Sequence, residues 1–141
     1  MERFRPDQMV ELLSELGHAK LTAKNMNWYK SDNITLYVAQ SKPSMYGRAN
    51  WYFEFWNSIR SKTLDSIEDD DASLILVDYI NSRYILLDSE TVEWVRNNSS
   101  RKRKEEIVSE FVVKKIDDDF YLVPYLTGTG LFNKVEVMYF G

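Results

Sequence analysis

The chain of 141 residues has no cysteine and a single histidine, His18. Without cysteine it forms no disulfide, holds no thiolate-bound zinc and has no cysteine nucleophile. One histidine also excludes a zinc site built from several histidines and leaves one candidate for a histidine-dependent catalytic triad. Any enzyme chemistry is therefore expected to use carboxylates, lysines, hydroxyls or a hard metal ion such as Mg²⁺.

Long apolar segments are missing as well. No stretch approaches the ~20 apolar residues that span a bilayer, and residues 1–6 lack the apolar core of a signal peptide. Together with the absence of cysteine, this predicts a cytoplasmic protein that does not contact a membrane. The length predicts a single domain over residues 1–141, and a hydrophobic fraction of 44% is typical of a globular protein.

The net charge of −4 is unevenly distributed along the chain. Residues 1–62 hold nine basic and six acidic residues, a net charge of +3. Residues 63–141 hold nine basic and sixteen acidic residues, a net charge of −7. The N-terminal part is therefore better suited to a polyanion such as DNA or RNA, while the overall negative charge argues against a non-specific nucleic-acid coat protein.

Hydrophobic periodicity predicts an α+β fold: an N-terminal helix, then a mostly antiparallel or mixed sheet with one or two short inserted helices. The helix is expected over residues 6–17, where Met9, Leu13 and Leu16 recur at helical spacing and Gly17 suits the C-cap. Alternation and apolar runs predict strands over residues 19–24, 34–39, 50–56, 73–80, 83–87, 107–116, 120–126 and 135–140. Short helices are expected over residues 59–67 and after Asp88 or Ser89, and loops over 25–31, 43–49 and 97–104.

The densest aromatic stretch is residues 50–56, in which five of seven residues are aromatic. Successive side chains of a strand point to opposite faces, so the three odd-numbered aromatic residues are expected on one face. Tyr52, Glu54 and Trp56 then share the other face. Either both faces are covered and the strand lies mid-sheet, or Tyr52 and Trp56 form an open platform on which a base, a sugar or a peptide stacks.

A second pattern links the expected N-terminal helix to the strands that follow it. The helix ends in Glu-Leu-Leu-Ser-Glu-Leu-Gly at residues 11–17, and the second strand closes on Gln40-Ser41-Lys42. Over residues 6–42 this resembles the start of the PD-(D/E)XK nuclease superfamily, which includes archaeal Holliday-junction resolvases and Mrr-like restriction nucleases. There a helix precedes a hairpin that ends in (D/E/Q)-x-K.

The resemblance implies a Mg²⁺ site as the only cofactor site. The metal would be held by Asp32 and Gln40 with the assistance of Glu15 or Glu11, and the catalytic residues would be Gln40 and Lys42, with Lys42 polarising the attacking water or the phosphate. On a continuous strand Asp32 and Gln40 lie about 26 Å apart, so both reach one ion only if the strand bends. In the alternative interpretation, Gln40 and Lys42 end a strand at the surface and no cofactor is required.

Cations and aromatic residues suggest a contact with nucleic acid. Four adjacent cations, at residues 101–104, are expected in a polar loop that either contacts phosphates or is solvated and neutralised by the glutamates after it. Aromatic residues interleaved with cations suit base stacking with backbone neutralisation. The candidate nucleic-acid-binding residues are Tyr46, Arg48, Trp56, Arg101, Lys102, Arg103 and Lys104.

We therefore expect a non-catalytic recognition module that binds DNA or RNA, of the kind found in restriction or defence systems. Two alternatives remain open. One is a Mg²⁺-dependent nuclease similar to the PD-(D/E)XK enzymes. The other is a protein-interaction or homo-oligomerisation domain that binds no nucleic acid, with the aromatic residues in its core or interface.

Overall fold

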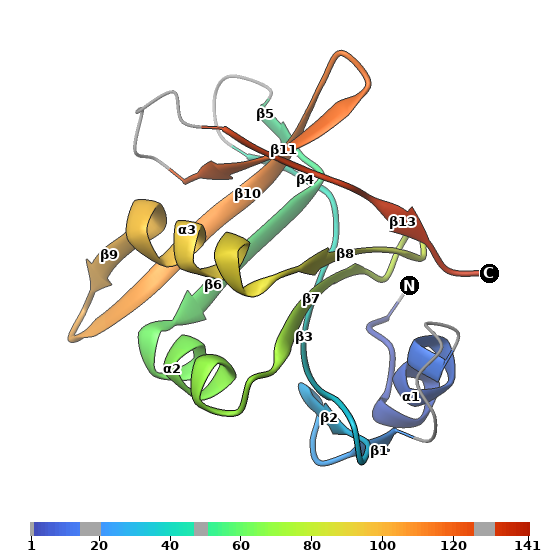
Figure 1. The fold of residues 1–141 in the computed structure, drawn as a ribbon. Coiled ribbons are helices and arrows are strands. Elements are labelled where there is room, and N and C mark those ends of the chain that lie inside the picture. The colour runs from blue at the N-terminus through green and yellow to red at the C-terminus, as the bar shows by residue number, and fades with distance from the viewer. Residues whose placement is uncertain (1, 15–20, 47–50, 126–131) are drawn as a thin grey trace.

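The computed structural model describes residues 2–14, 21–46, 51–125 and 132–141, and it has the α+β fold with an N-terminal helix that the sequence predicts. The helices among these residues are α1 (Pro6–Ser14), α2 (Ser61–Asp69) and α3 (Ser89–Ser99). The described strands form a six-stranded sheet, a five-stranded sheet and a separate two-stranded hairpin. Figure 1 shows α1 at the end of the molecule away from α3, next to the first strands.

The six-stranded sheet is mixed. Its order is β1 (Thr22–Ala23), β2 (Trp28–Lys30), β3 (Thr35–Ser41), β7 (Ser73–Asp78), β8 (Arg83–Leu87) and β13 (Met138–Tyr139). Strands β3 and β7 are parallel, and the other neighbouring pairs are antiparallel. Parallel strands cannot be joined by a tight turn. The long connection between β3 and β7 includes β6 (Phe55–Arg60), which belongs to the five-stranded sheet.

The five-stranded sheet is antiparallel throughout. Its path is β12 (Asn133–Val135), β11 (Asp119–Pro124), β10 (Glu106–Ile116) and β6 (Phe55–Arg60), and β9 (Ser100–Arg103) pairs with the beginning of β10. Strand β10 has β6 along one edge and, one after the other, β9 and β11 along the opposite edge. The separate hairpin consists of β4 (Ser44–Tyr46) and β5 (Trp51–Phe53).

Two apolar cores cover both faces of the six-stranded sheet. One lies between the two sheets and beneath α2 and α3, and its fully buried residues include Phe55, Leu64, Leu76, Val95 and Phe111. The other lies between the six-stranded sheet and α1, and its fully buried residues include Met9, Leu13, Leu36, Val38 and Ile75. Burial on both faces explains why β7 reads as a continuous apolar run.

The expectation of loops over residues 25–31 and 97–104 is wrong. Strand β2 lies in the first segment, where Tyr29 is fully buried and its hydroxyl donates to the Met26 carbonyl at 3.0 Å. In the second segment α3 continues to Ser99, and β9 follows directly. The backbone of β9 pairs with β10, so a strand forms although its sequence is charged and has no apolar alternation.

Other boundaries differ from the prediction as well, and the strand expected over residues 135–140 is split between the end of β12 and β13. Residues 43–49, expected as a loop, contain β4, and α2 begins at Ser61 rather than near residue 59 because Arg60 still pairs with Val108. The expected single strand over residues 50–56 is interrupted at Glu54, which separates β5 from β6. The Glu54 amide donates to the Val113 carbonyl at 2.8 Å, so the chain already lies against β10 at the break, and the paired strand β6 begins at Phe55.

Asp88 caps α3 and contributes a pH-dependent part of the stability. Its Oδ1 accepts a hydrogen bond from the Thr91 amide at 2.8 Å, and hydrogen bonds from Thr91 hold the pKa of Asp88 below its usual value of 3.8. Because the folded-state pKa is lowered, this stabilisation is present above that usual value and is lost as the pH falls through the folded-state pKa. We expect Asp88→Ala to lower the free energy of unfolding by about 1 kcal/mol at neutral pH.

Urea denaturation at pH 7 and at acidic pH tests this expectation. The difference between the parent and Asp88→Ala should shrink in acid, because the protonated carboxyl is a weaker acceptor. Asp88→Asn is the control, since asparagine also caps a helix but does not titrate. If Asp88→Ala lowers the free energy of unfolding equally at both pH values, the negative charge of Asp88 does not contribute to the cap.

Candidate nucleic-acid interface

The five-stranded sheet has two faces of different character. Its inner face packs beneath α2 and α3 through residues such as Phe55, Ile59, Phe111 and Val113, and Figure 1 shows both helices on this side of β6 and β10. Side chains alternate along each strand, so the neighbours of these residues point to the opposite face. We call that opposite face, built on Trp56, Ser58 and Arg60 of β6 and the even-numbered residues of β10, the outer face.

A row of cations crosses the outer face near the beginning of β10. Val108 pairs with Arg60 on one side and with Arg101 on the other. The two arginines are therefore two strand spacings apart, about 10 Å between backbones, and their side chains are 64% and 43% exposed. Arg103 pairs with Glu106, so it is the next residue of β9 on the same face, closer to the turn between β9 and β10. Arg60, Arg101 and Arg103 thus form one cationic end of the face.

An aromatic residue stands next along β10. Trp56 pairs with Val112, which pairs in turn with Val123. The Trp56 side chain is 39% exposed, and its ring centroid lies 6.0 Å from that of Tyr125. Val112 and Tyr125 are both buried, so Trp56 rests on a fixed apolar base with part of its surface accessible to a ligand.

A second row of cations crosses the face at the far end of β10. Lys114 pairs with Tyr121, and Tyr121 pairs with Lys134. The Tyr121 ring meets the ring of Phe132 edge to face at 6.0 Å, and Phe132 is 50% exposed. Along β10 the outer face therefore presents cations, then Trp56, then cations with a second pair of aromatic rings.

The outer face carries more positive than negative charge among the described residues. Its cations are Arg60, Arg101, Arg103, Lys114 and Lys134, and its carboxylates are Glu106, Glu110 and Asp119. Five cations against three carboxylates give the face a net charge of +2 on a chain of −4.

Two of the ion pairs on this face are exposed and weak. Arg60 Nη1 lies 3.9 Å from Glu106 Oε1, and Lys134 Nζ lies 3.4 Å from Asp119 Oδ1. All four side chains are at least half exposed. Such pairs contribute about 0–1 kcal/mol, so a phosphate competes readily for these cations.

The ion pair between Arg101 and Glu110 is of a different kind. Arg101 Nη2 lies 2.9 Å from Glu110 Oε1, an ion pair by distance whose angle is not that of a hydrogen bond. The Glu110 side chain is only 2% exposed, whereas that of Arg101 is 43% exposed. Arg101 therefore neutralises a buried carboxylate while part of its side chain remains exposed to solvent.

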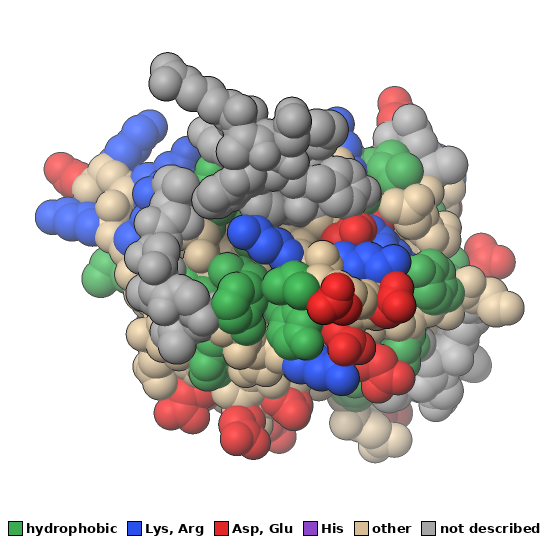
Figure 2. Space-filling view, turned by 90° about the horizontal axis from the view of Figure 1, so that it is seen from above, with side chains coloured by type: hydrophobic (Ala, Val, Ile, Leu, Met, Phe, Trp, Pro, Cys, Tyr) green, Lys and Arg blue, Asp and Glu red, His purple; other side chains and the backbone are tan. Residues whose placement is uncertain are grey.

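The structure brings three of the predicted nucleic-acid-binding residues together. Trp56, Arg101 and Arg103 lie on the outer face, although 44 residues of chain separate Trp56 from Arg101. Figure 2 shows Lys and Arg side chains gathered at the left-hand end of the molecule, where β9 lies in Figure 1.

The other predicted binding residues are placed differently. Lys102 pairs with Ile107 and points to the opposite face from Arg101 and Arg103. Lys104 lies in the turn between β9 and β10, with a φ of 57°. The backbone of Tyr46 belongs to β4, and Arg48 lies outside the described residues.

The predicted catalytic residues, Gln40 and Lys42, are not brought near the predicted metal ligand Asp32. The Gln40 amide is engaged twice with the backbone of Phe4: its Oε1 accepts from the Phe4 amide, and its Nε2 donates to the Phe4 carbonyl, each at 2.9 Å. Lys42 is exposed just after β3, whereas Asp32 lies in the turn before β3, at the opposite end of that strand. Glu15 lies outside the described residues.

The described part of the chain has no preformed metal-binding site. Glu11 is exposed on α1. No group of three or more histidine, cysteine, aspartate or glutamate side chains there is arranged so that it could hold a metal ion. Within the same residues, no helix has the length and apolar character needed to cross a bilayer.

A buried charged network joins the two sheets. Arg83 donates from Nε to Asp78 Oδ2 at 2.7 Å and from Nη2 to Glu54 Oε2, and all three side chains are at least 90% buried. The guanidinium carbon lies 5.2 Å from the centre of the Phe55 ring. Burial alone lowers the pKa of Arg83, but the hydrogen bonds to Glu54 and Asp78 outweigh it and raise that pKa. These groups have no access to a ligand, so the network holds the sheets together.

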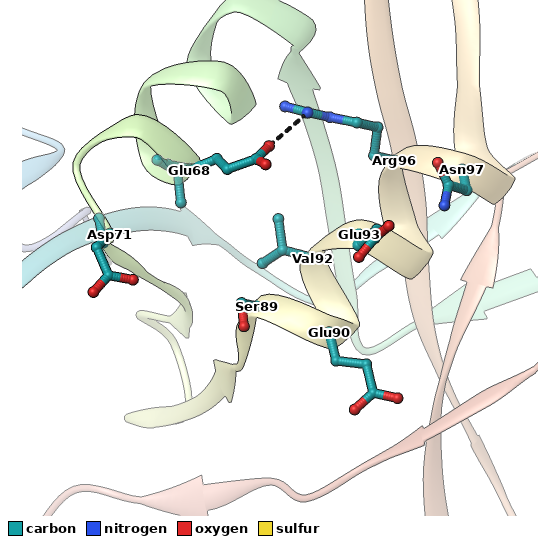
Figure 3. A pocket seen from close by; sticks show the side chains of 10 residues that line it. Glu68, Asp71, Ser89, Glu90, Val92, Glu93, Arg96 and Asn97 are labelled. Atoms are coloured by element: carbon teal, nitrogen blue, oxygen red, sulfur yellow. Dashed lines mark hydrogen bonds and ion pairs between the residues drawn. The ribbon is translucent and has the colours of Figure 1, made fainter.

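The helix side of the molecule is acidic. A pocket of about 500 Å³ lies between α2 and α3 (Figure 3). Its acidic lining residues are Glu68, Asp71, Glu90 and Glu93. Arg96 also lines it and is 3.0 Å from Glu68 and 2.9 Å from Asp65. This side repels a polyanion, which favours approach to the outer face.

The candidate binding residues chosen from the sequence do not include Arg60, Lys114, Lys134, Tyr121 or Phe132. Alternation within β10 gave no signal for Lys114, because Val108, Val112 and Ile116 lie on the same face of the strand as Lys114. The remaining residues join the face only through the pairing of β6, β11 and β12, which the local sequence does not encode. Comparisons with known proteins gave no match: no family model, no curated protein and no solved structure matches this chain.

Proposed function

We propose that this protein is a non-catalytic recognition module that binds nucleic acid on its outer face. One observation carries the proposal: strand pairing places Trp56 between two rows of cations on a single face of the five-stranded sheet. Cations neutralise phosphates, and aromatic rings stack on bases, so their combination suits a nucleic acid better than a protein ligand.

The charge distribution supports the same ligand. The outer face is positive, while the pocket between α2 and α3 is lined by carboxylates. A polyanion is therefore attracted to one side of the molecule and repelled from the other. The net negative charge of the whole chain predicts moderate affinity that depends strongly on salt.

Two neighbouring residues of β9 provide a sharp test. Arg103→Glu reverses a charge on the outer face, and Lys102→Glu makes the same change in net charge on the opposite face. We expect Arg103→Glu to weaken binding to a short labelled oligonucleotide about tenfold, and to reduce the slope of log affinity against log salt by about 1. Lys102→Glu should change both quantities much less. Fluorescence anisotropy between about 50 and 200 mM salt measures them.

Neither variant removes a buried contact, so the comparison reports on binding rather than on folding. Arg103 and Lys102 are both exposed. Equal losses in the two variants would mean that only the overall charge matters. Unchanged affinity in both, or the absence of binding by the parent protein at low salt, would overturn the proposal.

A further inference from the structure

We infer that the ligand of the outer face is a single strand rather than a duplex, an inference that rests on the proposed function. In this arrangement one base stacks on Trp56, and the Tyr121–Phe132 pair receives another. The phosphates lie on the cations to either side of Trp56: the arginines of β6 and β9 at one end, and Lys114 and Lys134 at the other. The occupied segment is short, on the order of four nucleotides, at the low end of the range for single-strand-binding folds.

The position of the aromatic rings favours a single strand. Trp56 and Phe132 are exposed by 39% and 50% of their surface, and each rests against a second ring at 6.0 Å. A ring stacks on a base only if the face of that base is free. In a duplex the base faces are covered by neighbouring base pairs, whereas a single strand can splay its bases onto such a platform.

The shape of the face argues in the same direction. From β6 to β12 the sheet is three strand spacings wide, about 14 Å between backbones. The major groove of B-DNA is about 12 Å wide and admits a helix or a two-stranded ribbon. The outer face is therefore too broad to enter a groove, and against a duplex it would meet only the backbone, leaving Trp56 without a partner.

The order of residues along β10 matches a strand that alternates phosphate and base. Three positions of β10 mark this order. Val108 pairs with Arg60 and Arg101, Val112 pairs with Trp56, and Lys114 pairs with Tyr121. These positions are about 14 Å and then about 7 Å apart along the strand. A single strand that follows β10 thus passes from a cation pair to a stacking platform, and then to a second set of cations and rings.

The test compares probes and Trp56 variants in the full chain. The probes are a labelled oligonucleotide of mixed sequence, about ten nucleotides long, as single-stranded DNA and RNA, and the same DNA annealed to its complement. The variants are Trp56→Leu, which keeps an apolar side chain but cannot stack, and Trp56→Phe, which keeps a ring. Thermal melting of each variant shows that it is folded before binding is measured.

We expect the parent protein to bind the single strand at least about tenfold more tightly than the duplex. Trp56→Leu should weaken single-strand binding by about 5- to 100-fold, as removal of a stacking ring generally does. It should leave duplex binding and the salt slope nearly unchanged, because no phosphate contact is lost. Trp56→Phe should retain most of the affinity, because it keeps a ring. At a purely electrostatic site, Trp56→Leu and Trp56→Phe would bind equally well.

The possible outcomes separate this inference from the proposed function. Duplex binding as tight as single-strand binding, with Trp56→Leu equal to the parent, overturns the single-strand inference and leaves the nucleic-acid interface in place. Single-strand binding that is indifferent to Trp56→Leu also overturns it. Absence of binding to all three probes overturns the proposed function itself.

Discussion

Replacing Arg83 by methionine is expected to lower the free energy of unfolding by about 3–5 kcal/mol, the largest stability effect that we anticipate for an exchange of a charged residue in this protein. Arg83 holds two carboxylates at once, Asp78 in β7 and Glu54 between β5 and β6. Asp78 is fully buried, and Glu54 is 8% exposed. Methionine fills a similar volume but leaves both carboxylates buried without their cation, which costs more than the ion pairs themselves contribute.

The two carboxylates do not depend on Arg83 equally. Asp78 also accepts hydrogen bonds from the Ile80 and Asn81 amides and from the Asn81 side chain. Among the residues that the structure describes, the side chain of Glu54 has one partner, Arg83. Glu54→Gln in the Arg83→Met background should therefore recover more stability than Asp78→Asn in that background.

Urea denaturation of matched variants measures these differences. Arg5→Met is the control, because the Arg5–Asp7 pair at 3.3 Å is about 70% exposed on both sides and should contribute little. Arg83→Lys keeps the charge but loses the forked geometry, and an intermediate loss is expected. If Arg83→Met costs no more than Arg5→Met, the network does not join the sheets in the way described.

The fold was predictable wherever a single segment carries a long apolar pattern. The helix that begins at Pro6, the β7–β8 hairpin and strand β10 each have enough periodicity to be read locally. Short pieces were not predictable: β2 has three residues and β9 is entirely polar. Their backbone hydrogen bonds are made with strands that lie elsewhere in the sequence, so tertiary pairing outweighs local propensity.

The site was predictable in its residue types but not in its geometry. Trp56 and Arg101 were candidates because exposed aromatic residues and clustered cations suit nucleic acid. That they share a face follows from the register of β6 and β9 on β10, and a shift of one residue would place either on the other side. The separation of Lys102 from Arg103 by the plane of the sheet is likewise a property of the pairing.

Arg101 is the residue in which stability and binding are combined, and its exchange is the second large effect that we expect. Arg101→Met should lower the free energy of unfolding by about 2–3 kcal/mol, because it leaves the Glu110 carboxylate buried without a cation. The effect is smaller than for Arg83, since the Arg101 side chain is 43% exposed and solvent screens the pair. Urea denaturation of the two variants side by side measures the ratio.

A double variant separates the two roles of Arg101. Arg101→Met with Glu110→Gln removes both charges of the pair and should restore most of the lost stability, because a neutral amide is far less costly to bury than a carboxylate. Binding should not be restored, because the guanidinium that faces the phosphates is still missing. We expect the salt slope for a single-stranded probe to remain about 0.7 below that of the parent, the value for one lost phosphate contact.

Glu110→Gln alone completes the comparison, and we expect it to change the affinity for a single strand in the opposite direction. It removes a negative charge from beneath the outer face and leaves Arg101 without competition from a carboxylate, so affinity for a single strand should rise several-fold at low salt. If the double variant binds as tightly as the parent, Arg101 serves only to neutralise Glu110. The cationic end of the outer face then consists of Arg60 and Arg103 alone, both of which can be exchanged without uncovering a buried charge.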